Sequence, residues 1–154
     1  MDLKNIVAAV DFSDTSLLAL ETAFSLASET GATLHLLHVL DEHLLAPIGP
    51  LRLTMAELRE QRKEQMERLI PENWDDSVPI RRMVIEGDPA SAVAEFALDH
   101  DADMIVAGTH GRKGVARVLM GSTAEKLLRE APCQILIVKS HKSAVPESSA
   151  EAEA

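Results

Sequence analysis

Short apolar runs alternate with amphipathic segments along most of this chain. Each apolar run is only six to eight residues long, which is typical of strands buried on both faces of a parallel sheet. The runs predict five strands, at residues 5–10, 32–39, 80–86, 103–108 and 133–139. Two consecutive arginines in the third run, Arg81 and Arg82, indicate a strand at the edge of the sheet.

The segments between these runs have helical periodicity and helix end signals. The sequence DFSDTS supplies capping residues before the first helix, and Gly31 follows its last turn. Pro89 suits the first turn of the third helix. Helices are expected at residues 17–28, 53–70, 90–100 and 122–130.

The strict alternation of strands and helices predicts a single α/β domain. Its fold class is a doubly wound, Rossmann-like sheet of five parallel strands with helices on both faces. The domain is expected to span residues 1–140, because residues 141–154 lack apolar periodicity and read as a disordered tail. In such folds ligands bind beyond the carboxyl ends of the strands.

Composition excludes several classes of function. The 154-residue chain has a net charge of -10 and only 3% aromatic residues, so we expect no affinity for nucleic acid. Its one cysteine, Cys133, predicts a reducing compartment and an inert core thiol. The N-terminus does not resemble a signal peptide and no apolar run could span a membrane, so a cytoplasmic location is expected.

Four of the 7 glycines lie between residues 108 and 121, directly after a predicted buried strand and before a predicted helix. Gly108, Gly111, Gly121 and Ser122 form the pattern G-x2-G-x9-G-[ST]. A phosphate needs converging backbone amides that no side chain blocks, and the amino end of a helix provides them. The pattern therefore predicts a phosphate site, to which Arg112 could add positive charge.

A purely structural interpretation of the same residues stays open. Ser122 and Glu125 match the capping box S-x-x-E, in which the two residues satisfy the first helical amides themselves. Asp11 likewise either contacts a ligand or caps the first helix. The pattern is not a P-loop, since no G-x4-G-K-[ST] is present.

Four stretches, IVAAVDFS, LHLLHV, IVAGTHGRKGVARVLMGST and APCQILIVK, resemble the universal stress protein family, and specifically its ATP-binding branch. The resemblance covers residues 3–139, and the glycine pattern is its specific part. It implies an adenine nucleotide α-hydrolase-like sheet with ATP at the carboxyl edge, where the backbone of Val39 recognises adenine. One departure is Gln134, where many relatives have proline.

The positions matching the family's nucleotide contacts are Ala9, Val10, Asp11, Val39, Ala107, Gly108, His110, Gly111, Gly121, Ser122 and Thr123. We expect no metal site made of side chains alone, because the histidines lack ligand spacing. Any Mg²⁺ is expected to be held by the phosphates.

The resemblance also implies a homodimer formed through residues 135–138, with larger assemblies left open. No general base or arginine finger is evident, so we expect an ATP-binding regulator of an unknown protein partner, with at most slow hydrolysis. Two alternatives remain at this point. One is a small ATPase or adenylylating enzyme of related fold, and the other is a structural dimer in which the glycine segment is only a turn.

Overall fold

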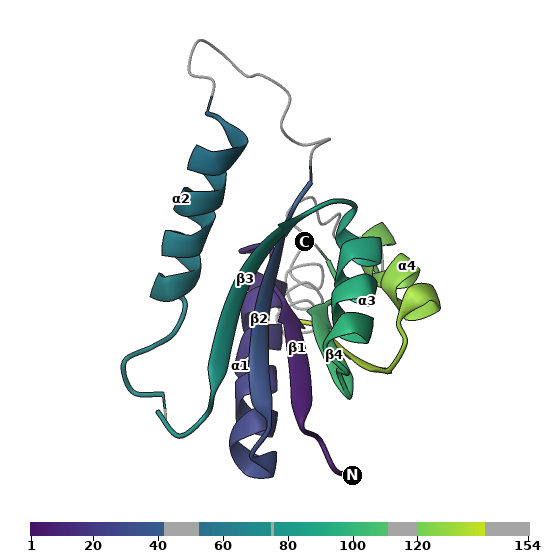
Figure 1. Ribbon diagram of the computed structural model, residues 1–154. Helices are drawn as coiled ribbons and strands as arrows, with labels where there is room; N and C mark the ends of the chain where they lie inside the picture. Colours follow the sequence, from purple (N-terminus) through teal and green to yellow (C-terminus); the bar gives the residue numbers. More distant parts are fainter. Residues whose placement is uncertain (42–52, 75, 111–119, 141–154) are drawn as a thin grey trace, which may run out of the picture.

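The computed structural model describes residues 1–41, 53–74, 76–110 and 120–140 (Figure 1). The predicted tail beyond residue 140 therefore lies outside the described residues. The elements follow one another as β1 (Asn5–Ala9), α1 (Asp14–Thr30), β2 (Thr33–Leu40), α2 (Met55–Arg68), β3 (Ile80–Glu86), α3 (Pro89–Asp99), β4 (Met104–Gly108), α4 (Ser122–Glu130) and β5 (Gln134–Val138).

The five strands form one parallel sheet in the order β3-β2-β1-β4-β5. The predicted fold class is thus confirmed, as is the edge position predicted for the strand that contains Arg81 and Arg82. The chain first builds the sheet outward from β1 to β3 and then returns to the other side of β1 with β4. The strand order therefore reverses between β1 and β4, which is where folds of this class bind ligands.

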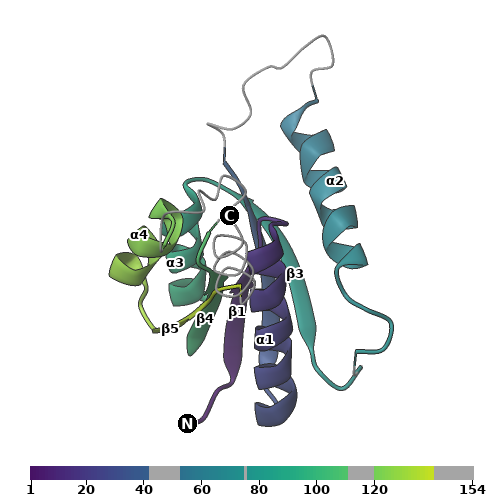
Figure 2. The ribbon, with the colours of Figure 1, turned by 180° about the vertical axis from the view of Figure 1, so that it is seen from behind.

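Side chains alternate between the two faces of the central strand β1. Ile6 and Ala8 belong to the apolar cluster that α1 and α2 cover, whereas Val7 belongs to the cluster under α3 and α4. Figures 1 and 2 show these two helical layers from opposite sides. Because both faces of β1 are buried, its side chains form a continuous apolar run and not an alternating one.

The ends of α1 are fixed by local hydrogen bonds. The helix begins at Asp14, three residues before the predicted start, because Ser13 is the N-cap and its Oγ accepts from the Ser16 N–H at 3.3 Å. Gly31 ends the helix in the left-handed conformation with φ 74°, as its position in the sequence predicted.

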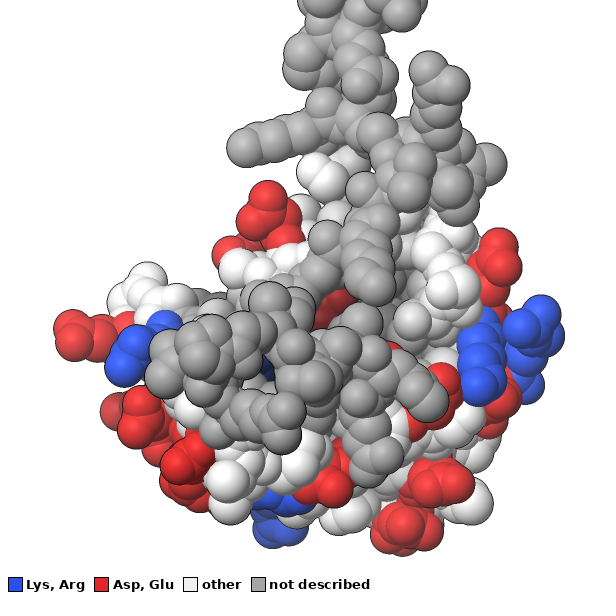
Figure 3. Space-filling view, turned by 90° about the horizontal axis from the view of Figure 1, so that it is seen from above, with Lys and Arg blue, Asp and Glu red and all other residues white. Residues whose placement is uncertain are grey.

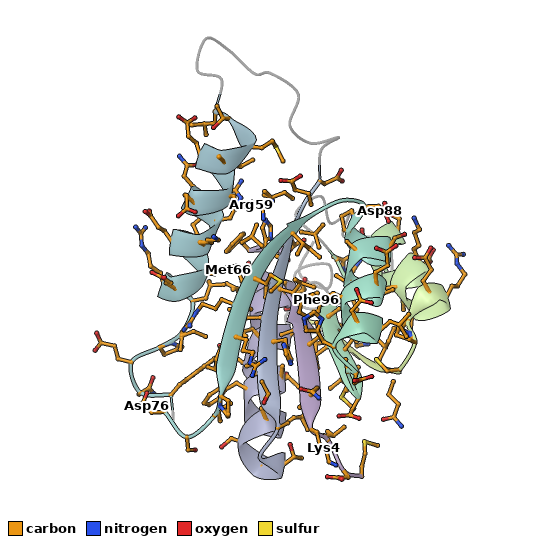
Figure 4. The ribbon with its side chains drawn as sticks, in the orientation of Figure 1. Lys4, Arg59, Met66, Asp76, Asp88 and Phe96 are labelled. Atoms are coloured by element: carbon orange, nitrogen blue, oxygen red, sulfur yellow. The ribbon has the colours of Figure 1, made fainter. Side chains whose placement is uncertain are left out.

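Helix α2 lies alongside the edge strand β3, and most of its residues are exposed to solvent (Figure 4). It begins with a capping box between Thr54 and Glu57, and it buries only Leu58 and Met66. Arg59 reaches from α2 to the strand, where it donates to the Val84 carbonyl at 3.0 Å and pairs with Glu86.

In the described parts of the chain no helix is long and apolar enough to cross a membrane.

A histidine is buried near the amino ends of β1 and β2, under α3. His35 is 4% exposed, and its Nε2 lies 3.1 Å from Asn5 Oδ1, an acceptor, so Nε2 carries the hydrogen. The ring packs against Phe96 and lies 5.6 Å from the ring of His100. Burial, with further contributions from His100 and Arg81, lowers the pKa of His35.

This buried histidine makes acid destabilising. The folded chain binds a proton at His35 less readily than the unfolded chain, which protonates it below about pH 6.5, so unfolding takes up protons in acid. We expect the free energy of unfolding, measured by urea denaturation, to fall as pH drops from 7.5 to 5.5. His35→Gln should flatten this dependence, and a variant with the slope of the unaltered chain would contradict the assignment.

Candidate functional site

Three neighbouring strands, β2, β1 and β4, end together at the upper edge of the sheet in Figure 1. Asp11 lies two residues after β1, Val39 is the penultimate residue of β2, and Gly108 ends β4. The structure therefore places at one edge three strand ends whose residues match the family's nucleotide contacts. A hydrogen bond also joins α1 to the segment after β4, since Thr15 Oγ1 at the start of α1 donates to the His110 carbonyl at 2.5 Å.

Asp11 is fixed by the turn that leads from β1 into α1. Its N–H donates to Ser16 Oγ at 3.2 Å, and its Oδ1 accepts from the Ser13 N–H at 3.0 Å and also from the Ser13 hydroxyl. Since Ser13 is the N-cap of α1, the interpretation of Asp11 as the helix cap is wrong. The carboxylate instead orients the residue that caps.

The residue between Asp11 and Ser13 has a left-handed backbone. Phe12 has φ 66°, a conformation that costs an L-residue about 1–2 kcal/mol. This backbone brings the Ser13 N–H back to the Asp11 carboxylate and turns the chain away from the sheet. Nothing in the sequence pattern distinguished Phe12 from an ordinary core residue.

The backbone of Val39 faces the point where β1 ends. Val10 N–H donates to the Leu37 carbonyl at 2.9 Å, so Leu37 directs its backbone groups toward β1. Alternate residues of a strand face the same neighbour, and Val39 therefore also directs its N–H and C=O to that side. Since β1 ends at Ala9 and the chain turns at Phe12, these groups lie beyond the last bond of the β1–β2 ladder.

Gly108 is required because another part of the chain packs directly against it. A Cβ at this position would lie 2.8 Å from Thr15 Oγ1, 2.9 Å from the Thr15 carbonyl carbon and 3.0 Å from the Ser16 N. The first turn of α1 thus passes over the end of β4 at a distance that no side chain permits. The group that approaches Gly108 most closely in the structure is this helix.

The two ends of the glycine segment meet. Gly121 N–H donates to the Thr109 carbonyl at 2.6 Å, and Thr109 N–H donates to the Val138 carbonyl of β5 at 2.9 Å. These bonds place the start of α4 next to the end of β4. The predicted residues Gly111 and Arg112 lie outside the described residues.

Helix α4 begins differently from the other three helices. Ser13, Thr54 and Asp88 cap α1, α2 and α3 with side-chain oxygens, whereas the N-cap of α4 is Gly121, which has no side chain. The alternative interpretation, a capping box of Ser122 and Glu125, is therefore wrong: Ser122 is the first helical residue, and the Glu125 N–H bonds to the Gly121 carbonyl. The first amides of α4 are left without a cap from the N-cap residue, which is the arrangement that binds an anion.

The electrostatic surroundings do not favour anions in general. Figure 3 looks down on the carboxyl edge and shows Asp and Glu side chains around much of its rim, with few Lys and Arg between them. Glu125 also lies in the first turn of α4. As far as the described residues go, an anion at this edge would therefore depend on local backbone amides and not on the charges of nearby side chains.

Two further expectations concern reactive groups. Burial raises the pKa of the Cys133 thiol, and the nearby Asp103 raises it further, which agrees with the inert thiol that the sequence predicted. Within the described ranges, no three His, Cys, Asp or Glu side chains gather as they would around a metal ion.

The sequence analysis missed the side chains that organise this edge. Ser13, Thr15 and Ser16 hold Asp11 and the carbonyl of His110 in place, and His38 Nδ1 donates to the Val10 carbonyl at 2.7 Å. The serines and the threonine were visible only as helix capping residues. His38 is buried, and nothing in its spacing indicated that it bonds to the end of β1.

Comparison with known proteins gives one consistent result. Residues 2–139 match the model of the universal stress protein family. A universal stress protein of Methanocaldococcus jannaschii is 35% identical over 144 residues, which cover 90% of this chain and 84% of the relative.

Solved structures agree in fold. UspA of Lactobacillus plantarum superposes with a TM-score of 0.74 at 25% identity, covering 90% of this chain and 99% of that one. A universal stress protein of Archaeoglobus fulgidus, solved in complex with dAMP, has a TM-score of 0.65 at 22% identity and covers 90% of this chain and 100% of its own.

The tight approach at Gly108 can be tested by adding one methyl group. We expect Gly108→Ala to lower the free energy of unfolding by about 1–3 kcal/mol, because the new Cβ would push the first turn of α1 away. The measurement is urea denaturation followed by circular dichroism. Gly108→Ala combined with Thr15→Ala removes the contact with Thr15 Oγ1 but keeps the clash with the backbone of residues 15 and 16, so it should not restore stability. Full restoration would mean that the Thr15 hydroxyl alone causes the strain.

Proposed function

This chain belongs to the universal stress protein family, and we propose that it binds ATP at the carboxyl edge of its sheet and acts as a nucleotide-dependent regulator. The observation that carries the proposal is the start of α4. Of the four described helices it is the one whose N-cap lacks a side chain, and Gly121 places it beside the end of β4. Its first amides suit a phosphate group.

The remaining parts of the site follow from the same geometry. The backbone of Val39 faces the end of β1 and suits the edge of an adenine ring, while Asp11 lies between it and the phosphates and suits a ribose hydroxyl. Ala9, Val10, Ala107 and Gly108 would form the floor at the ends of β1 and β4. The dAMP complex of the Archaeoglobus fulgidus relative supports an adenine nucleotide as the ligand.

Around the phosphates we assign Gly121, Ser122 and Thr123 to direct contact, with His110 at the start of the loop. Gly111 and Arg112 belong to the same proposal on the basis of the glycine pattern. A Mg²⁺ ion would be held by the phosphates themselves. The regulated partner would be a protein of the cytoplasm, the compartment that a single Cys133 fits.

Mass spectrometry of nucleotide retained through purification tests the site without assuming which nucleotide binds. Retention of ATP or another adenine nucleotide is the expected result. Calorimetry with ATP and with AMP then gives the affinity, expected in the micromolar range. Flat traces with both nucleotides, together with an empty purified protein, would reject the proposal.

A side chain at position 121 should prevent ATP binding without unfolding the protein. The residue has φ -72° and ψ 161°, a conformation open to any residue, so a side chain causes no backbone strain. We expect Gly121→Ala to weaken ATP binding about tenfold and Gly121→Val to abolish it, because both fill the space above the first amides of α4. Unfolding midpoints serve as the control, and unchanged affinity in Gly121→Val would place the phosphates elsewhere.

We further propose that the chain forms a homodimer through β5. Such dimers could also assemble into larger oligomers. The two edges of the sheet differ. At the β3 edge, Arg59 occupies the outward-facing carbonyl of Val84. At the β5 edge, the Val138 carbonyl bonds to β4, so Ile135 and Ile137 direct their backbone groups outward, where no described residue bonds to them. An exposed edge of this kind favours pairing with another strand.

A proline substitution at each edge of the sheet tests which edge strand, β3 or β5, forms the dimer. Ile137→Pro removes an outward-facing N–H without touching the β4–β5 ladder and should convert a dimer into a monomer in sedimentation analysis. Arg82→Pro removes the equivalent N–H at the β3 edge and should leave the dimer intact. Dissociation by both substitutions, or by neither, would argue against pairing through β5.

A further inference from the structure

The left-handed residue of the site is an aromatic one, which is unusual. Among the described residues outside glycine, only Phe12 and Asp101 have positive φ, and aspartate tolerates this conformation far better than a bulky aromatic residue does. Contacts of the Phe12 side chain must therefore stabilise a backbone that Phe itself disfavours.

Two side chains contact the ring of Phe12. The ring of His38 lies 4.8 Å away at an angle of 52°, and the Arg62 guanidinium lies 5.9 Å from the Phe12 centroid, within the range of a cation–π contact. The ring also packs against the apolar cluster under α1 and α2. Phe12 is thus clamped between β2 and α2.

His38 is itself anchored. It is 7% exposed, and its Nδ1 donates to the Val10 carbonyl at 2.7 Å, so the imidazole joins β2 to the end of β1. Arg62 is held on α2 by a bond of 2.8 Å from its Nη1 to Gln65 Oε1. The two groups that contact Phe12 are therefore each held by a hydrogen bond, His38 to the neighbouring strand end and Arg62 to its own helix.

The backbone of Phe12 decides where Asp11 and Ser13 point. With Phe12 left-handed, the Ser13 N–H returns to Asp11 Oδ1, and Ser13 in turn caps α1 and places its Oγ 3.4 Å from the His110 carbonyl oxygen. A change of Phe12 to negative φ would redirect the backbone between Asp11 and Ser13. The geometry of these bonds, and with it the orientation of Asp11 toward a ligand, would then change.

We propose that Phe12 is a positioning residue for the nucleotide, and that its clamp couples α2 to the nucleotide site through Arg62. This inference rests on the proposed function for its ligand. The ring holds the left-handed turn, and the turn presents the Asp11 carboxylate and the start of α1 to the bound nucleotide. Because coupling is reciprocal, a nucleotide that tightens the turn also tightens the contact between Phe12 and α2.

Two substitutions at Phe12 separate the backbone from the ring. Phe12→Ala removes the clamp and keeps the cost of positive φ, so ATP affinity measured by calorimetry should fall about tenfold. Phe12→Gly removes the same ring, but glycine adopts positive φ freely, so its affinity should stay within about threefold of the unaltered chain. An equal loss in both variants would show that the ring itself contacts the nucleotide and would overturn the proposal, as would unchanged affinity in Phe12→Ala.

A substitution of Arg62 tests the coupling between α2 and the nucleotide site. Arg62→Met keeps the aliphatic length and removes the charge, so it should weaken ATP binding about threefold in the unaltered chain and not at all in the Phe12→Gly background. A loss that persists in the Phe12→Gly background would show that Arg62 acts on the nucleotide directly, and the coupling would be wrong. Arg68→Met, at an exposed position near the end of α2, is the matched control and should change nothing.

Urea denaturation without nucleotide separates failure of this inference from failure of the proposed function. The unfolding midpoint of Phe12→Ala should lie below that of Phe12→Gly, the reverse of their order at an ordinary position. A midpoint at or above that of Phe12→Gly would overturn the clamp. If the unaltered chain binds neither ATP nor AMP, the proposed function fails and positioning of a nucleotide fails with it, while the order of the midpoints still decides the clamp.

Discussion

The close approach of α1 to the end of β4 determines how this edge of the sheet is built. The first turn of the helix passes over Gly108 at a distance that excludes even a methyl group. From there Thr15 can reach the His110 carbonyl, and Ser13 can cap the helix while bonding to Asp11. The ends of β1 and β4, which are far apart in the sequence, are thereby fixed by hydroxyl groups at the start of α1, while His38 joins β2 to the end of β1.

This constraint also explains how one glycine segment can serve two purposes. Gly108 is required by the helix that packs on it, whereas Gly121 leaves the first amides of α4 without a side-chain cap. The first of these glycines makes the edge compact, and the second leaves it open to an anion. The surface that the described residues form around this edge is rich in carboxylates, so these side chains would not favour a phosphate and the backbone amides at Gly121 would have to attract it (Figure 3).

The outer edges of the two outer strands, β3 and β5, are covered to different extents. Helix α2 lies beside β3 and covers part of its edge with Arg59, although it buries little apolar surface of its own. The β5 edge has no equivalent cover among the described residues. A helix that is attached by two buried side chains, a few polar contacts and one cation–π contact is well suited to respond to changes near Phe12.

The sequence by itself determined the α/β class, the parallel sheet, the edge position of the strand with Arg81 and Arg82, and the α-helix that begins at Ser122. These depend on local periodicity and on short-range end signals, which a sequence displays directly. It also indicated which strand ends share an edge, because topology follows from the order of the elements.

Only the tertiary structure decided how Asp11, Ser122 and Phe12 are used. Asp11 and Ser122 have cap-forming side chains, yet Ser13 and Gly121 are the N-caps, because contacts with the neighbouring strand ends set where each helix begins. The positive φ of Phe12 depends on His38 and Arg62, which lie 26 and 50 residues further along the chain. Contacts of this kind form between distant segments, so no local pattern of the sequence could have shown them.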